Sequence, residues 1–314
     1  MRVTLIHNSK AGDGEQPSGD VLTALIRQAG YDVVYRSAKD EDWQATLNDP
    51  GAFVVAAGGD GTVGKVAKQL VGRGIPLAIL PLGTANNIAK TFGLLETPLE
   101  QLIGGWADAQ RVSMDGAIAH GPWGSTYCIE SVGLGLFVQT LAQANHSSAL
   151  DRAESADDEL AAALKMLNQQ IELCAAQPLT VVLDGQDISG QYVLLEAMTI
   201  PYVGPNLHFA PEAGLGDGQL TVVLVREGEQ AMLSEYLNDC LAGKQDPAPL
   251  TSYRGQHLRI EGQGFDIHAD DDILPYHTWA VPPNRGVIEV KVDPQALELL
   301  LPSRGDSQTY CDSD

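Results

Sequence analysis

The chain has 314 residues, of which 44% are hydrophobic, so it is long enough to bury substantial cores and to form two domains. Asp and Glu number 41 against 19 Lys and Arg, and the net charge of -22 disfavours binding to nucleic acid and to anionic membrane surfaces. The sequence shows no signal peptide and no apolar run of membrane-spanning length, and its four scattered cysteines form no CxxC pair. These features predict a soluble cytoplasmic protein with reduced thiols.

The first third of the chain alternates short apolar runs with helical patterns. The predicted buried strands are 3–7, 31–35, 52–57 and 76–80, and the predicted helices are 20–28, 63–71 and 85–92. Continuous apolar runs separated by helices are typical of a parallel sheet. The pattern therefore predicts an α/β N-terminal domain over residues 1–114.

The sequence pattern changes at about Asp115, from alternating strands and helices to paired strands separated by turns. The predicted strands lie within 178–198, 216–225, 256–262, 265–269 and 286–292, after a long helix predicted over 153–176. This pattern predicts a β-rich, antiparallel, sandwich-like second domain over residues 115–301. The polar residues 302–314 are predicted to form a disordered tail.

The segment VVAAGGDGTVGKVA at 54–67 ends a buried strand in a cluster of glycines. Gly58, Gly59 and Gly61 allow close approach of the backbone to another molecule because they carry no Cβ. The helix that follows presents free amide hydrogens and the positive end of its dipole, which favour a phosphate group. The alternative interpretation is a tight strand-to-helix turn without a ligand.

A second turn of this kind follows the next predicted strand, at PLGTANNIAK, residues 81–90. Two such turns at neighbouring strand ends would form one phosphate cradle.

The dinucleotide fingerprint is disfavoured because Pro17 stands where its third glycine would fall. GDGTVGKV approaches a P-loop, but Val66 replaces the hydroxyl residue that would hold magnesium.

The pairing of GGDGT at 58–62 with PLGTANNIAK at 81–90 resembles the catalytic domain of bacterial diacylglycerol kinase-like lipid kinases, a family that also includes sphingosine and ceramide kinases. NSKAGDG at 8–14 is similar to the family's first-strand loop, and PEAGLGDGQL at 211–220 is similar to a later family segment. The resemblance covers nearly the whole chain. It implies an α/β domain that binds ATP on glycine loops and a β-rich domain through which lipid enters.

The resemblance also implies which residues bind ATP. They are Asn8, Ser9, Lys10, Ala11, Gly12, Ser37, Gly58, Gly59, Asp60, Gly61, Thr62, Val63, Gly64, Gly83, Thr84 and Asn86. The alternative role of Thr84 and Asn86 is helix capping. Gly64 and Lys65 stand where the family usually has an asparagine and an acid.

The resemblance further implies a structural magnesium site in the second domain. Asp217 matches the family aspartate that anchors the ion, and the backbone carbonyls of Gly214 and Gln219 are the implied co-ligands. An Asp-Gly hairpin turn is the alternative interpretation.

The segment HADDDIL at 268–274 stands at the position of the family's catalytic DGE. Asp270 matches the aspartate and Asp272 the glutamate, and Asp60 is a further catalytic candidate. Strand alternation predicts that Asp270 and Asp272 share one side of the strand, where like charges raise one pKa, and that Asp271 lies on the other side. Asp270 is the first candidate for the base that takes the acceptor proton. A solvated turn is the alternative.

These observations predict an ATP-dependent, magnesium-requiring kinase that transfers the γ-phosphoryl group to a hydroxyl of a lipid or lipid-like acceptor such as diacylglycerol. The alternatives are a kinase of a soluble substrate such as NAD, and a catalytically impaired ATP- or lipid-binding protein. Transient membrane contact is expected and nucleic acid is not an expected partner. The sequence leaves the oligomeric state open, including a homodimer.

Overall fold

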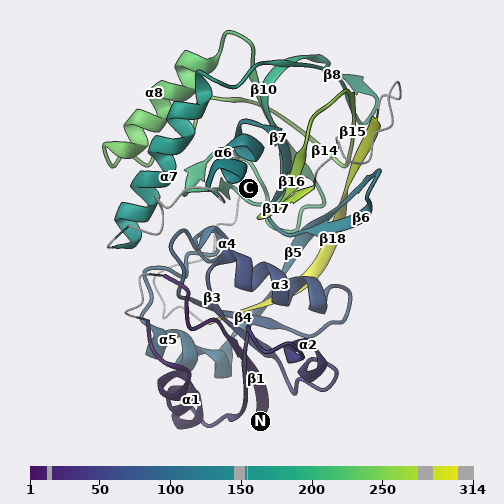
Figure 1. Ribbon diagram of the computed structural model, residues 1–314. Coiled ribbons are helices and arrows are strands. Elements are labelled where there is room, and N and C mark those ends of the chain that lie inside the picture. Colours follow the sequence, from purple (N-terminus) through teal and green to yellow (C-terminus); the bar gives the residue numbers. More distant parts are fainter. Residues whose placement is uncertain (13–15, 145–152, 154, 275–285, 303–314) are drawn as a thin grey trace. The chain divides into compact units, whose positions relative to one another are not determined.

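The computed structural model describes residues 1–12, 16–144, 153, 155–274 and 286–302 (Figure 1). Contacts between residues divide the chain into two compact units, one formed by residues 1–114 together with the C-terminal stretch from Ala296, the other by residues 115–295. Among the residues described, no helix is long and apolar enough to cross a membrane. Apart from Pro302, the predicted disordered tail lies outside the described residues.

The first unit is built on a parallel sheet with the strand order β18-β4-β3-β1-β2. Its strands are β1 (Arg2–His7), β2 (Asp32–Ser37), β3 (Val54–Gly58), β4 (Leu77–Pro81) and the end of β18 (Gly286–Leu301). Its helices are α1 (Gly19–Gln28), α2 (Trp43–Thr46), α3 (Asp60–Leu70), α4 (Asn87–Thr91), α5 (Leu99–Gly104) and the 3-10 helix η1 (Gly105–Asp108). The α/β character predicted for this part of the chain is confirmed.

The last strand, β18, enters this parallel sheet from the other end of the chain. Leu299 pairs with Leu77 of β4, and the Gly72 amide donates to the Ala296 carbonyl over 3.0 Å. Leu299 is 1% exposed. Residues 296–302 therefore pack with the first unit, whereas the sequence pattern had placed everything up to residue 301 in the second domain. The unit to which residues 296–302 belong depends on strand pairing between distant segments, which no local sequence pattern indicates.

The second unit is a β-rich, sandwich-like domain, as predicted. One set of paired strands runs in the order β14-β13-β10-β7-β16-β17, and another contains β9-β8-β15-β18-β5-β6. The bounds are β5 (Gln110–Gly121), β6 (Gly124–Cys128), β7 (Ser131–Gly135), β8 (Gln177–Leu183), β9 (Gln186–Asp187), β10 (Gly190–Met198), β13 (Leu220–Arg226), β14 (Thr251–Gly255), β15 (His257–Gly262), β16 (Ile267–Ala269) and β17 (Asp272–Leu274). A separate two-stranded sheet pairs β11 (Tyr202–Val203) with β12 (Leu207–His208).

Two apolar cores cover the two faces of the central strands in this unit. On β13, Val222 and Leu224 point into the core between the sheets, while Val223 and Val225 point into the core beneath the helices. The helices are α6 (Leu136–Ala144), α7 (Ala156–Ile171) and α8 (Gln230–Leu241), and Figure 1 shows α7 and α8 side by side. Burial of both faces explains why β13 reads as a continuous apolar run.

Helix α7 is shorter than the helix predicted over 153–176. It begins after Ser155, whose hydroxyl accepts from the Asp158 amide at 3.2 Å, and it ends at Ile171. Cys174 is buried beyond the end of the helix, so the periodic apolar pattern continued past the last helical residue. The apolar periodicity indicates which residues are buried, and residues of the loop after a helix can be buried as well.

Candidate functional site

Three turns of the first unit meet at the carboxyl ends of the parallel strands β1, β3 and β4. The side-chain NH₂ of Asn8 donates to the Thr62 hydroxyl over 3.3 Å, which joins the first turn to the second. A Cβ added to Gly59 would lie 3.0 Å from the Cα of Gly83, and one added to Gly83 would overlap the Gly59 backbone. The second and third turns are therefore in direct backbone contact, and glycine is required at the contact.

The first turn also reaches the third. Gly12 has φ +67°, and a Cβ placed on it would lie 2.7 Å from the Leu82 carbonyl oxygen. Three of the four sequence segments that the resemblance assigned to ATP thus converge at one edge of the sheet, which is where open α/β sheets bind ligands.

Asp60 holds two of these turns together. Its carboxylate accepts the Asn87 amide at 2.8 Å and the Ile88 amide at 3.0 Å, so it caps the start of α4 from the first turn of α3. These amides are among the donors that a helix leaves unpaired at its N-terminus. Asp60 therefore has a structural role that the catalytic assignment did not foresee.

Asn86 closes the third turn and does not cap the helix with its side chain. Its oxygen accepts the Gly83 amide at 2.9 Å, its NH₂ donates to the Gly83 carbonyl at 2.6 Å, and its φ is +52°. The capping alternative for Asn86 is therefore wrong, because the side chain turns back along the chain. Thr84 is half-buried on the same turn.

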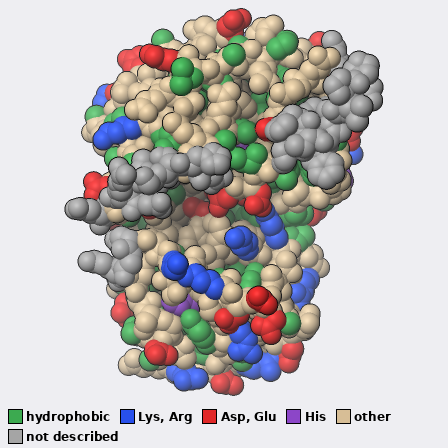
Figure 2. All heavy atoms as spheres, viewed as in Figure 1, with side chains coloured by type: hydrophobic (Ala, Val, Ile, Leu, Met, Phe, Trp, Pro, Cys, Tyr) green, Lys and Arg blue, Asp and Glu red, His purple; other side chains and the backbone are tan. Residues whose placement is uncertain are grey.

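A pocket of about 230 Å³ lies beside these turns, within the first unit. Its lining residues are Ile6, Asn8, Ala38, Lys39, Trp43, Thr62, Lys65 and Val66. Loss of hydration, followed by the positive charge of Lys10, lowers the pKa of Lys39. The pocket therefore gathers positive charge on a chain whose net charge is strongly negative, and Figure 2 shows Lys and Arg side chains on the face of this unit that carries α3.

The remaining candidates of the first unit divide by burial. Ser9 and Lys10 are exposed, whereas Ala11, Val63 and Gly64 are buried and pack inside the unit. Ser37 and Gly58 end the strands β2 and β3, Gly61 is the second residue of α3, and Gly12 lies in the turn after β1. Ser37 accepts the Lys39 amide at 3.2 Å, which places Lys39 at the end of β2.

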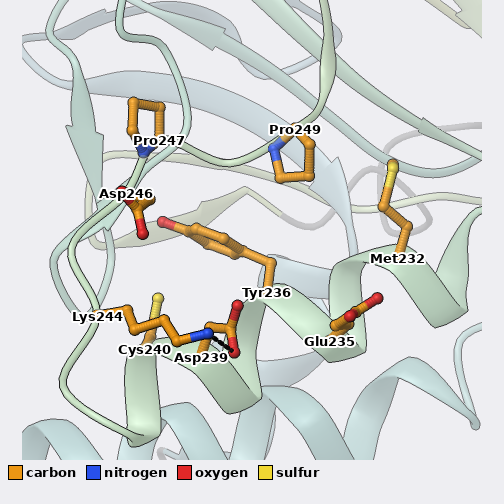
Figure 3. A pocket seen from close by; sticks show the side chains of 9 residues that line it. All are labelled: Met232, Glu235, Tyr236, Asp239, Cys240, Lys244, Asp246, Pro247 and Pro249. Atoms are coloured by element: carbon orange, nitrogen blue, oxygen red, sulfur yellow. Dashed lines mark hydrogen bonds and ion pairs between the residues drawn. The ribbon is translucent and has the colours of Figure 1, made fainter.

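A larger pocket of about 340 Å³ lies in the second unit, at α8 and the segment after it (Figure 3). Glu235, Asp239 and Asp246 line it, and only Lys244, paired with Asp239 at 2.9 Å, contributes positive charge. Three carboxylates against one ammonium group repel phosphate. The pocket of the first unit, lined by Lys39 and Lys65, is therefore the better phosphate site, although its volume is smaller.

In the second unit, Asp270 and Asp271 form the turn of a hairpin, so the predicted strand alternation at HADDDIL is wrong. Strand β16 ends at Ala269, which pairs with Asp272, the first residue of β17. Asp270 has φ +51°, a conformation found in turns. The tertiary pairing of a tight hairpin overrides the apparent run of strand residues.

The Asp270 carboxylate binds backbone amides. Its Oδ1 accepts from Ile129 at 3.0 Å and from Glu130 at 2.9 Å, while Asp272 is exposed. Asp270 thus fixes the segment between β6 and β7, and Asp272 is the accessible carboxylate of the pair.

A buried ion pair supports the same hairpin. The Nε2 atom of His268 lies 2.9 Å from the Glu196 carboxylate, and its Nδ1 lies 2.9 Å from the Asp270 carbonyl oxygen. Burial lowers the pKa of His268, but the charge and hydrogen bond of Glu196, with the Asp270 carbonyl, outweigh burial and raise it. Both ring nitrogens face acceptor oxygens, so the imidazole connects Glu196 to the turn that carries the acidic residues.

The contacts of Asp217 do not fit the divalent cation that the resemblance implies. One carboxylate oxygen accepts the Gln219 amide at 3.0 Å, and the other forms an ion pair with Arg254. The carboxylate packs against the Cα of Gly214, where a Cβ would overlap it. Magnesium needs about six oxygen ligands. The two polar groups described at the Asp217 carboxylate, the Gln219 amide and the Arg254 guanidinium, are N–H donors. No group of three or more His, Cys, Asp or Glu side chains within the described ranges could hold a metal ion.

Several residues of these sites were not singled out from the sequence. Lys39 follows β2 by two residues and Lys65 follows Thr62 by three, so strand-end position and helical spacing would have found both. Glu196 and His268 are 72 residues apart, and no local pattern links them.

A parallel α/β unit with glycine turns at its strand ends and a lysine-lined pocket is the arrangement of a nucleotide-binding enzyme. Residues 2–116 match the model of the diacylglycerol kinase catalytic domain, and residues 137–301 match the YegS C-terminal NAD kinase beta sandwich-like domain. The chain therefore belongs to the diacylglycerol kinase/YegS family of lipid kinases, which are phosphotransferases.

Individual relatives extend over almost the whole chain. A diacylglycerol kinase of Mycobacterium tuberculosis is 25% identical over 322 residues, covering 97% of this chain and 96% of the relative. The crystal structure of a diacylglycerol kinase from Bacillus anthracis superposes with a TM-score of 0.66 at 18% identity, covering 96% of each chain. A yeast NADH kinase structure superposes with a TM-score of 0.52 at 10% identity, covering 98% of this chain and 85% of that one. These two structural likenesses concern the fold.

Proposed function

We propose that this kinase transfers the γ-phosphoryl group of ATP to a hydroxyl group of diacylglycerol or a closely similar lipid. The observation that carries the proposal is the convergence of three turns beside a pocket lined by Lys39 and Lys65. The diacylglycerol kinase of Mycobacterium tuberculosis, similar over 97% of this chain, supports the choice of acceptor. The reaction takes place in the cytoplasm, where ATP is present, and Cys128, Cys174 and Cys240, the cysteines that the structure describes, form no disulfide.

ATP binds with its phosphates against the turns at Gly59 and Gly83 and close to the two lysines. Amide hydrogens at the start of α3 and the lysine charges oppose the negative charge of the phosphates. Magnesium bound with the nucleotide would neutralise further charge on the transferred group. Asn8 and Thr62 hold the neighbouring turns in register.

Asp272 takes the proton of the acceptor hydroxyl. Asp270 fixes the turn that positions Asp272. Both oxygens of Asp270 accept backbone amides, which suits a residue that fixes a turn. Asp272 is exposed at the first position of β17 and is available to an acceptor. A positioned carboxylate is the group that kinases use to orient or deprotonate the attacking hydroxyl.

Phosphoryl transfer from labelled ATP, with magnesium present, tests this function. The acceptors are diacylglycerol, sphingosine and ceramide in detergent micelles, and NAD in solution. Label is expected in the diacylglycerol product. Label in NAD alone would show a kinase of a soluble substrate, and ATP binding without transfer to any acceptor would show an impaired enzyme.

Asp272→Asn is expected to lower the rate of transfer at least about 100-fold, because general base catalysis contributes about 10²–10⁴-fold. ATP affinity should change little. Asp271→Asn, a change of the adjacent turn residue, which is also exposed, is the matched control and should retain activity. Equal, mild effects of the two substitutions would contradict the role of Asp272.

A further inference from the structure

Asp217 and Arg254 form an ion pair in the second unit, between the turn before β13 and strand β14. Their side chains are 30% and 32% exposed. Strand pairing places Arg254 opposite Thr221, close to this turn. The sheet itself therefore brings the guanidinium to the carboxylate, and the pair does not depend on two long side chains meeting on an open surface.

Other polar groups of the turn are also bound by protein groups. The Gly218 amide donates to the buried Asp115 carboxylate over 2.7 Å, and the Gln256 side chain donates to the Gly218 carbonyl over 3.2 Å. Asp217 itself accepts the Gln219 amide. A cation that approached the other Asp217 oxygen would have to displace the guanidinium, and the positive charge of Arg254 would repel it.

We propose that Arg254 replaces a divalent cation as the counter-ion of Asp217, so that the turn at residues 214–219 folds without a resident metal ion. The guanidinium suits this role because it stays protonated throughout the physiological pH range and its N–H groups match a carboxylate. The proposal concerns a structural ion and not the magnesium that accompanies a nucleotide. It holds whether or not the chain transfers phosphate.

Thermal unfolding in EDTA and across a MgCl₂ titration tests the proposal, without nucleotide. The acidic surface can bind magnesium weakly elsewhere, so wild type is compared with Asp217→Asn. The same shift of the unfolding midpoint with magnesium is expected for both proteins. A saturable shift in wild type that Asp217→Asn abolishes would show a metal ion at Asp217 and overturn the proposal.

Removing the guanidinium should restore a need for metal. Arg254→Met is expected to unfold at a lower temperature in EDTA and to recover with magnesium, and the double variant with Asp217→Asn should lose this recovery. Arg259→Met is the matched control, since Arg259 pairs with Glu261 and Glu289 on β15 and β18. If folded Arg254→Met responds to magnesium only as wild type does, the proposal is wrong. If Arg254→Met does not fold, the comparison of wild type with Asp217→Asn decides.

Discussion

Individual carboxylates in this acidic chain hold turns in place. Asp60, Asp115 and Asp270 come from different elements, and each accepts at least two backbone amides. The donors belong to Asn87 and Ile88, to Gly218 and Gln295, and to Ile129 and Glu130, respectively. Hydrogen bonds to an ionised carboxylate are stronger than neutral ones. At the scale of the residue, two of the three catalytic candidates, Asp60 and Asp270, therefore also fix the backbone of the turns that they contact.

The buried pair of Glu196 and His268 gives a pH prediction. Because the folded state raises the pKa of His268, protonation stabilises the fold below the unfolded pKa of about 6.5, and this contribution is lost as pH rises through the folded value. Glu196→Gln removes the raising charge and leaves burial, which lowers the pKa. The variant should lose about 3–5 kcal/mol of unfolding free energy at low pH.

The measurement is the free energy of unfolding by denaturant between about pH 5 and pH 9, the range around the histidine pKa. The difference between wild type and Glu196→Gln should shrink as pH rises. Glu261→Gln, which alters a partly exposed pair with Arg259, serves as the control and should leave the pH profile unchanged. Parallel curves for wild type and Glu196→Gln would mean that His268 does not titrate as described.

At the scale of the element, the site depends on close contact between two strand-to-helix turns. Gly59 and Gly83 face one another across this contact, whereas Gly104, in α5, has open space around its Cβ position. A methyl group at the contact must push the turns apart. The turns then lose the backbone approach that a phosphate requires.

Gly83→Ala is therefore expected to weaken ATP binding at least about tenfold, which corresponds to about 1.4 kcal/mol. Gly104→Ala is the matched control, and it should leave ATP binding unchanged and slightly stabilise α5 because alanine is the better helix former. Calorimetric titration with ATP and a melting curve measure both effects. Loss of stability in Gly83→Ala with unchanged affinity would show that the contact is structural only.

At the scale of the whole molecule, the chain is strongly acidic and belongs to a family of lipid kinases. The net charge of -22 opposes approach to anionic lipid, so contact must come from local apolar or basic surface or from cations that bridge the charges.

Weak binding to anionic vesicles is expected, increased by millimolar magnesium and not by lowering the salt concentration. Sedimentation with vesicles of phosphatidylserine and phosphatidylcholine at several salt concentrations measures it, and vesicles of phosphatidylcholine alone are the control. Strong binding that fades as salt rises would reveal a concentrated basic face and would show that net charge is a poor guide for this protein.

The sequence by itself determined the α/β character of residues 1–114, the β-rich second part and the turns at Gly59 and Gly83. These features are local: apolar runs report burial on both faces, and glycines mark the points where strands give way to helices. The same local reasoning failed at HADDDIL, where a hairpin turn interrupts what looked like one strand.

Only the tertiary structure decided the contacts between distant segments. His268 meets Glu196 across 72 residues, Arg254 meets Asp217 across 37, and β18 returns to pair with β4. Each of these contacts depends on strand order and register, which determine the neighbours of a side chain. No periodic pattern in the nearby sequence indicates them. For this reason the sequence indicated a metal ligand at Asp217, while strand pairing supplied an arginine as its counter-ion.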